Sequence, residues 1–143
     1  MRHLAATDGS TKSDEAVRYA AMHAVALDGE LEIVHVLTPE TELVDGEVIM
    51  PGEEAALEEG QRILRQATSV AESVAEDRGG DLDVDTELLA GRPAEAITER
   101  ASETDADAIY IGHRGLSDQR ERVVGSVAKS VVDRATVPVM VIR

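Results

Sequence analysis

The chain has 143 residues, which is long enough for one domain with a hydrophobic core, and its composition shows no break that would suggest a second domain. The formal net charge is −15, from 29 acidic and 14 basic residues, and this opposes non-specific binding to nucleic acid or to an anionic membrane. Cysteine is absent, so disulfides and thiolate metal sites are excluded.

The acidic composition also bears on the working environment. Lys12 and Lys129 are the only lysines, and many carboxylates with few lysines fit a protein that works in concentrated salt, where ions screen self-repulsion. An ordinary acidic soluble protein is the alternative. The first residues lead directly into a strand pattern without signal-peptide features, and no apolar run approaches membrane-spanning length, so we expect a cytoplasmic protein.

Short apolar runs bounded by turn residues predict five strands. These runs are His3–Thr7, Leu31–Leu37, Leu82–Leu88, Asp107–Ile111 and Val137–Ile142. The third run alternates apolar with acidic residues, and the fifth contains Pro138, which cannot donate to a strand ladder, so both strands are expected at sheet edges. The apolar last strand invites pairing with a second copy of the chain.

Apolar residues at steps of three and four predict four helices between these strands. The first follows Thr11 or Ser13, either of which can cap it, and the others span Glu53–Arg78, Pro93–Glu103 and Ser126–Ala135. The expected buried faces are Ala16, Val17, Ala20, Ala21, Ala24 and Leu27 in the first helix, Ala56, Leu57, Ile63, Leu64, Ala67, Val70, Ala71, Val74 and Ala75 in the second, and Val127, Val131 and Val132 in the last. The acidic stretch from Thr38 to Pro51 is expected to be a loop.

Alternation of strands with helices predicts an α/β fold, in which a doubly wound, five-stranded parallel sheet carries four helices. The favoured strand order is 3-2-1-4-5. In this order the first and fourth strands are neighbours, so Asp8, which follows the first strand, lies across from Gly112, which follows the fourth. A ligand is expected at these carboxyl ends.

A glycine motif follows the fourth strand and leads into the last helix. Gly112 and Gly115 allow backbone N–H groups to approach a ligand closely, and Gly125 and Ser126 open a helix whose first N–H groups have no intrahelical partner. Helix ends of this kind attract phosphate. The motif therefore predicts a phosphate-binding loop.

Asp8 has two interpretations, and the sequence leaves both open. Its carboxylate can accept hydrogen bonds from a ribose hydroxyl or an adenine amine, or it can form an Asx-turn with the residues that follow it. Lys12 does not complete a P-loop, because the glycine that should precede Gly9 by five residues is absent. A phosphoacceptor role for Asp8 is also disfavoured, because Thr7 stands where an acidic neighbour would be needed.

The surroundings of the glycine motif are locally basic in a strongly acidic chain. The basic residues are Arg114, Arg120, Arg122, Lys129 and Arg134, against Asp118, Glu121 and Asp133. A polyanion would be attracted here, and a solvated face with paired charges is the alternative. The histidines show no metal-ligand spacing, and no serine elbow, cysteine nucleophile or close carboxylate pair supports hydrolytic chemistry.

With these residues the chain resembles the universal stress protein family over its full length. The family's ATP-binding pattern G-x-x-G-x9-G-[ST] is matched by Gly112, Gly115, Gly125 and Ser126 without a gap. Further matches are Ala6-Thr7-Asp8-Gly9-Ser10, His35-Val36 and Gly91-Arg92-Pro93.

The resemblance implies a Rossmann-like nucleotide-binding fold that binds ATP, with Mg²⁺ on the phosphates, and that forms a homodimer through the last strand at Val137, Val139 and Val141. The nucleotide-binding residues it implies are Ala6, Thr7, Asp8, Val36, Ile111, Gly112, Arg114, Gly115, Gly125, Ser126 and Val127. Asp8 would contact ribose or base, and the Val36 backbone would hold the adenine edge. Ala128 stands where some ATP-binding members carry threonine, so one hydroxyl contact is missing.

The favoured function is a nucleotide-dependent stress-response or regulatory module, in which binding rather than catalysis is the activity. One alternative is a slow ATPase or autophosphorylating enzyme with Ser126, Ser117 or Thr11 as acceptor, although no general base accompanies the loop. The other is a ligand-free dimeric interaction protein, in which the glycines serve only the turn.

Overall fold

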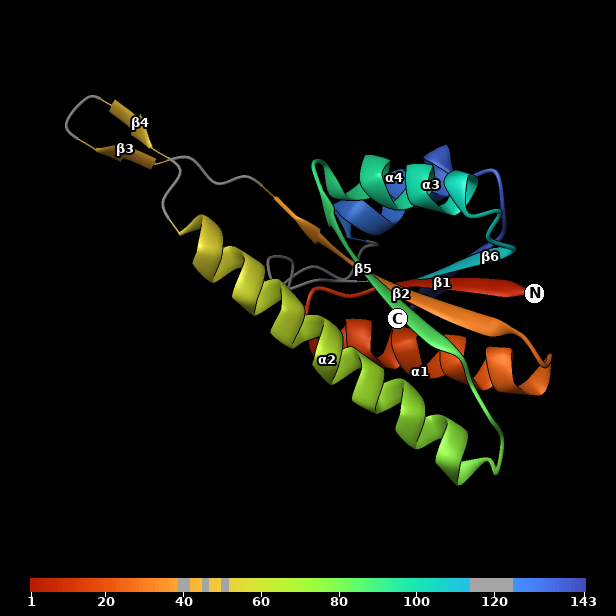
Figure 1. Ribbon diagram of the computed structural model, residues 1–143. Coiled ribbons are helices and arrows are strands. Elements are labelled where there is room, and N and C mark those ends of the chain that lie inside the picture. Colours follow the sequence, from red (N-terminus) through yellow and green to blue (C-terminus); the bar gives the residue numbers. More distant parts are fainter. Residues whose placement is uncertain (39–41, 45–46, 50–51, 114–124) are drawn as a thin grey trace.

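A parallel five-stranded sheet forms the centre of the protein. The computed structural model describes residues 1–38, 42–44, 47–49, 52–113 and 125–143. The strands are β1 (Arg2–Ala6), β2 (Glu30–Leu37), β5 (Val84–Ala90), β6 (Ala108–Gly112) and β7 (Val139–Ile142), in the spatial order β5-β2-β1-β6-β7 (Figure 1). This order confirms the predicted 3-2-1-4-5 topology, with the third and fifth strands at the edges.

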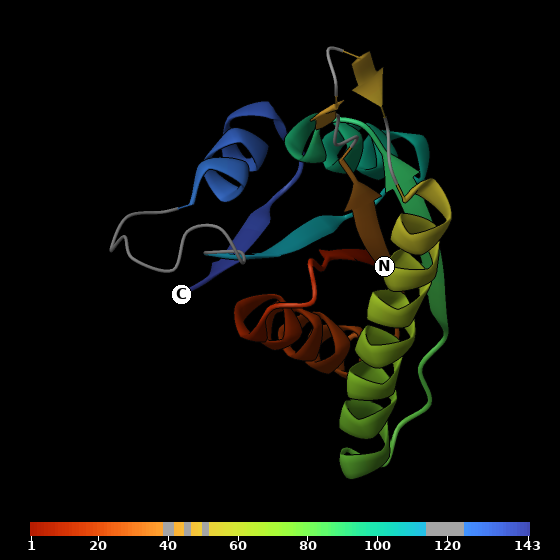
Figure 2. The same cartoon turned by 90° about the vertical axis from the view of Figure 1, so that its left-hand side faces the viewer.

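Two helices cover each face of the sheet. Helices α1 (Thr11–Ala26) and α2 (Glu53–Asp77) lie on one face, and α3 (Pro93–Glu103) and α4 (Ser126–Arg134) lie on the other (Figures 1 and 2). The chain builds outward from β1 through β2 to β5 and then returns to place β6 on the other side of β1. The strand order therefore reverses between β1 and β6, where α/β proteins bind ligands.

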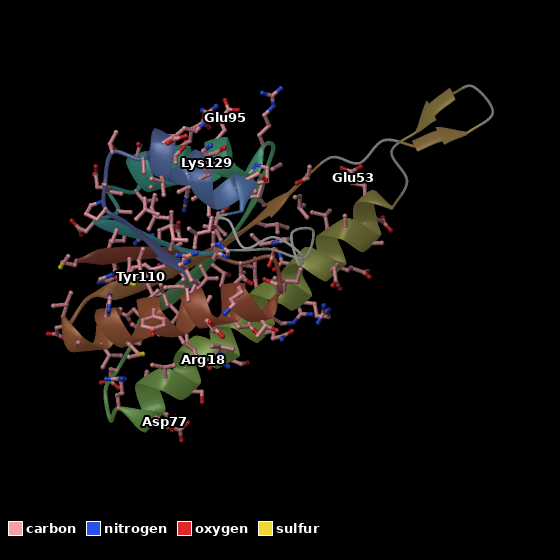
Figure 3. All side chains as sticks on the ribbon, turned by 180° about the vertical axis from the view of Figure 1, so that it is seen from behind. Arg18, Glu53, Asp77, Glu95, Tyr110 and Lys129 are labelled. Carbon is pink, nitrogen blue, oxygen red and sulfur yellow. The ribbon has the colours of Figure 1, made fainter. Side chains whose placement is uncertain are left out.

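Successive residues of each strand point to opposite faces of the sheet, so every strand contributes side chains to both helical layers. On the α1 and α2 face, Ala5, Leu31, Ile33 and Tyr110 pack against the alanines of α1, and Tyr110 lies between the sheet and α1 (Figure 3). On the α3 and α4 face the buried residues are Leu4, Ala6, Val34, Ile97, Ala101, Ala106, Ile109, Ile111, Ala128 and Val131. Small side chains along α1 allow the helix to approach the sheet closely.

The structure corrects the predicted cap of α1. Ser10 is the N-cap residue, and its side-chain oxygen accepts a hydrogen bond from the Ser13 N–H at 3.3 Å, so neither Thr11 nor Ser13 has this role. Leu27, predicted in the buried face, lies after the last turn and is 53% exposed.

Two helices bury less than their patterns predict. Ala56 and Leu57 are exposed because the 25-residue α2 is about 37 Å long, against about 26 Å for β2, so its ends extend past the sheet. Val127 and Val132 are 37% and 49% exposed, and α4 buries Ala128 and Val131 instead.

The stretch predicted as a loop contains a small antiparallel sheet. β3 (Glu42–Val44) pairs with β4 (Glu47–Ile49), and this hairpin lies beyond the first turn of α2, apart from the central sheet (Figure 1). The last central strand also begins later than predicted, at Val139, so Val137 lies outside β7. Of the described helices, none combines the length and apolarity needed to cross a membrane.

Candidate functional site

A cavity of about 690 Å³ lies at the carboxyl ends of β1, β2 and β6. This is the edge where the strand order reverses. The volume is within the range of small-molecule sites. Residues from both helical layers complete its wall, with Ile63 of α2 on one side and Ile97 of α3 on the other.

The cavity gathers most of the residues that the sequence predicts for nucleotide binding. Those that line it are Ala6, Thr7, Asp8, Val36, Ile111, Gly112, Gly125 and Val127. Ser126 is described but is not among the lining residues, and Arg114 and Gly115 lie outside the described residues.

Sequence reasoning missed several other lining residues, which include Ser13, Glu59, Arg62, Ile63, Ile97 and His113. Gly9, His35, Pro93 and Ala128 also line the cavity; the sequence singled them out through the family resemblance without counting them among the binding residues. Ser13 belongs to a run of hydroxyl residues that follows the first strand, and this enrichment is a signal from which Ser13 could have been predicted. Glu59 and Arg62 had no such signal, because an acidic and a basic residue three apart resemble any surface ion pair.

The turn after β1 is held by a network centred on Ser13, which is 5% exposed. The Ser13 hydroxyl donates to the Ser10 carbonyl at 2.9 Å, lies 3.0 Å from Thr7 Oγ1 and accepts the Asp8 N–H at 3.3 Å. Asp8 Oδ1 accepts the Ser10 N–H at 2.9 Å, which is the Asx-turn interpretation. The same carboxylate lines the cavity, so the two interpretations of Asp8 are compatible.

The two halves of the glycine motif meet at the cavity. The His113 N–H donates to the Ile142 carbonyl at 2.6 Å, and the Gly125 N–H donates to the His113 carbonyl at 2.7 Å. The second contact occupies the N–H of Gly125, one of the nucleotide-binding residues that the resemblance implies. The N–H groups of Ser126 and Val127, in the first turn of α4, have no intrahelical acceptor.

Gly112 is a glycine for a reason that is independent of any ligand. A Cβ at this position would lie 2.9 Å from the Lys12 carbonyl carbon and 3.1 Å from the Ser13 nitrogen. The first distance is shorter than real Cβ contacts and both involve backbone atoms, so a side chain here would push β6 and the start of α1 apart. The motif therefore serves the fold at Gly112.

β2 extends three residues past β1 and presents main-chain groups to the cavity. The Leu31 N–H donates to the Asp83 carbonyl and the Leu37 carbonyl accepts from the Gly91 N–H, so the main-chain groups of the odd-numbered residues of β2 are directed toward β5. The Val34 carbonyl accepts a hydrogen bond from the Thr7 N–H at 2.9 Å, so the main-chain groups of the even-numbered residues are directed toward β1. The N–H and carbonyl of Val36 therefore point into the space beyond the end of β1.

Helix α2 contributes a planar ion pair at the same end of the cavity. Arg62 Nε donates to Glu59 Oε2 at 2.8 Å and Nη2 donates to Oε1 at 2.5 Å. The hydrogen bond from Arg62 lowers the pKa of Glu59, so its carboxylate is ionised near neutral pH. His35 Nδ1 donates to the Thr7 carbonyl at 2.7 Å, which fixes the orientation of its ring.

Comparison with known proteins identifies the family. The model of the universal stress protein family matches residues 1–143. The chain belongs to this family. Universal stress protein MJ0531 of Methanocaldococcus jannaschii is 33% identical over 144 residues, which covers 96% of this chain and 78% of the relative.

Solved structures of the family match both fold and length. A universal stress protein in complex with cAMP is 28% identical, with a TM-score of 0.71 over 100% of this chain and 96% of the other. The universal stress protein from Archaeoglobus fulgidus in complex with dAMP is 26% identical, with a TM-score of 0.76 over 100% of this chain and 98% of the other. Both are Rossmann-like α/β proteins with an adenine nucleotide bound.

Proposed function

We propose that this universal stress protein binds an adenine nucleotide, in the first place ATP, in the cavity at the ends of β1, β2 and β6, and acts as a nucleotide-dependent regulatory module. The observation that carries the proposal is the cavity itself, which joins a main-chain edge at Val36, the Asp8 carboxylate and the start of α4. Related universal stress proteins with bound cAMP and dAMP support the same ligand class.

The spacing of the sheet fits the length of a nucleotide. β6 and β2 are separated by β1 alone, so their ends are about 10 Å apart. Phosphate suits the start of α4 after β6, because helix N-termini attract anions. The base then reaches Val36 of β2, whose N–H and carbonyl complement the acceptor and donor on one edge of adenine, and the ribose lies near Asp8 of β1.

The cavity residues fit a nucleotide better than a resident metal ion. Within the described parts of the chain, no three histidine, aspartate or glutamate side chains are placed to hold a metal. Mg²⁺ would therefore arrive on the phosphates of ATP, where it offsets their repulsion from Asp8. The protein's own groups bind and orient the ligand, and we assign them no catalytic step.

A homodimer through β7 is part of the same proposal. β7 is an edge strand, its Met140 is 37% exposed, and Val139 and Val141 are half-buried. An edge of this kind gains main-chain hydrogen bonds and apolar contacts by pairing with a second copy. Sedimentation of the free protein would measure the dimer directly.

Calorimetric titration of nucleotide-stripped protein with ATP and Mg²⁺ in molar KCl tests the proposal. Saturable binding is expected, and Gly125→Val should abolish it because the side chain would occupy the phosphate path. Gly125 has φ −58° and ψ 154°, which a valine adopts without strain, so the variant should fold and keep its thermal midpoint. Folded natural protein that gives no saturable heat with ATP, AMP or cAMP would refute the proposal.

A further inference from the structure

The described lining of the cavity contains no phenylalanine, tyrosine or tryptophan ring, and the aromatic rings present in it are the imidazoles of His35 and His113. The chain contains no phenylalanine and no tryptophan, and its tyrosines are Tyr19 and Tyr110. Tyr110 is buried beneath α1, where its hydroxyl contacts His3 and His23, and neither tyrosine is among the described residues that line the cavity. A larger flat partner for a bound base would have to come from another residue type.

Arg62 provides a flat group at the base end of the cavity. α2 packs over the β2 end of the sheet, where a Cβ at Gly60 would lie 2.8 Å from Leu88 Cδ1 and 3.4 Å from His35 Cδ2 and Leu37 Cδ2, so these side chains would have to shift to admit one. Glycine within a helix costs about 1 kcal/mol relative to alanine, so close packing is a reason for its presence. Gly60 lies between Glu59 and Arg62 in the sequence and brings both to the cavity wall.

The hydrogen bonds of Arg62 lie in the plane of its guanidinium and do not occupy its faces. The donors in the guanidinium plane are directed to protein acceptors, Nε and Nη2 to Glu59 and Nη1 to Gln66 at 3.3 Å. The side chain is 55% exposed, so it is accessible to a ligand. A guanidinium fixed in its plane by a bidentate carboxylate is preorganised to stack on a ring.

We propose that Arg62, held by Glu59, stacks its guanidinium face on the base of the bound nucleotide and takes the place of the missing aromatic residue. This inference rests on the proposed nucleotide function. A phosphate contact is the competing role. It is disfavoured because the phosphate end lies two strands away and because the Glu59 carboxylate beside Arg62 repels phosphate.

Titration of variants with adenosine and with ATP separates the two roles. Because stacking involves only the base, Arg62→Ala should weaken the binding of adenosine and of ATP by the same factor, roughly three- to ten-fold. Arg62→Lys should lose most of the affinity that Arg62 contributes, since an ammonium has no flat face and cannot make the bidentate contact. Glu59→Gln, which frees the guanidinium orientation, should lose less than Arg62→Ala.

The control is Arg65→Ala, which removes an equal charge from an exposed position of the same helix outside the cavity lining and should leave both affinities unchanged. The hypochromism of the adenine absorbance on binding gives an independent readout and should decrease in Arg62→Ala. A loss seen with ATP but not with adenosine would overturn the proposal in favour of phosphate contact. Unchanged affinities in Arg62→Ala, or an equal loss in Arg65→Ala, would also overturn it. Natural protein that binds neither ligand would overturn the proposed function together with it.

Discussion

A buried ion-pair network joins β1, β2 and α3, and we expect the fold to depend on it. The Glu32 carboxylate is 2% exposed and accepts hydrogen bonds from Arg100 Nε and Nη2, both at 2.9 Å, and from Arg2 Nη2 at 2.8 Å. Burial alone would raise the pKa of Glu32, but the hydrogen bonds and charge of Arg100, followed by those of Arg2, outweigh burial and hold this pKa below its ordinary value. Glu32 is therefore ionised inside the protein at neutral pH.

Arg100→Ala removes the bidentate partner and leaves a buried carboxylate with Arg2 alone. Breaking a buried pair in this way costs about 3–5 kcal/mol. We expect a value near the lower end, about 3 kcal/mol, because Arg100 is itself 25% exposed and water can partly replace it. At about 3 °C per kcal/mol for a chain of this size, the thermal midpoint should fall by about 10 °C.

Urea unfolding at pH 7 measures the loss, with Arg65→Ala as the control for removal of one exposed positive charge. The double variant Glu32→Gln, Arg100→Ala should be more stable than Arg100→Ala, because the uncompensated charge is gone. The deficit of Arg100→Ala should also shrink as the pH is lowered, since Glu32 can then take up a proton. A loss below about 1 kcal/mol at pH 7, typical of surface pairs, would show that the network is not a buried one in solution.

Three further outcomes are expected. Burial, followed by the charge of His23 and of the N-terminus, lowers the pKa of His3, so the folded protein favours the neutral imidazole. Stability should therefore be lost as the pH falls below about 6.5 and through the lowered pKa of the folded state. The slope of stability against pH should be smaller in His3→Asn. Equal slopes in thermal scans from pH 7.5 to 5.5 would contradict this. The thermal midpoint should rise from dilute buffer to molar KCl because the net charge is −15, and a flat or falling midpoint would count against screening. Gly112→Ala should lower the midpoint without any ligand present, because its Cβ meets the Lys12 backbone at 2.9 Å, and an unchanged midpoint would refute that packing.

The sequence was sufficient to predict the central fold because its signals are local and repeated. Each strand is a short apolar run, each helix an apolar stripe, and the rules for crossover connections then restrict the strand order. The two-stranded sheet within the predicted loop was missed because three-residue strands are too short to show a period. The sequence signal for this pairing is Asp45-Gly46, between Val44 and Glu47, because Asp-Gly is typical of two-residue hairpin turns.

Burial along α2 and α4 was predicted less well because periodicity identifies a face but not what lies beneath it. Leu57 continues the apolar stripe of α2, yet it lies where the helix has passed the end of the sheet and is 43% exposed. The cap of α1 was ambiguous for a different reason. Ser10, Thr11 and Ser13 can each accept a hydrogen bond from a helix N–H, and tertiary contacts with Thr7 decide among them.

The candidate site was predictable where it depends on strand ends and unpredictable where it depends on helix packing. Asp8, Val36 and Gly112 follow from the order of the strands, which brings three loop starts to one edge. Glu59 and Arg62 join them only because α2 crosses the same edge. Nothing in the spacing of these two residues distinguishes them from Lys12 and Glu15, which form a similar i,i+3 pair and do not line the cavity.

Two glycines that are equivalent in the sequence motif, Gly112 and Gly125, differ in the physical reason for being glycine. Gly112 permits the close approach of β6 to the start of α1 and would be needed in a protein that binds nothing. Gly125 has backbone angles open to any residue and donates its N–H to His113, so no steric requirement of its own backbone explains it. Because the backbone conformation of Gly125 does not require glycine, its substitution separates binding from folding more directly than substitution of Gly112, whose Cβ would meet the backbone of α1.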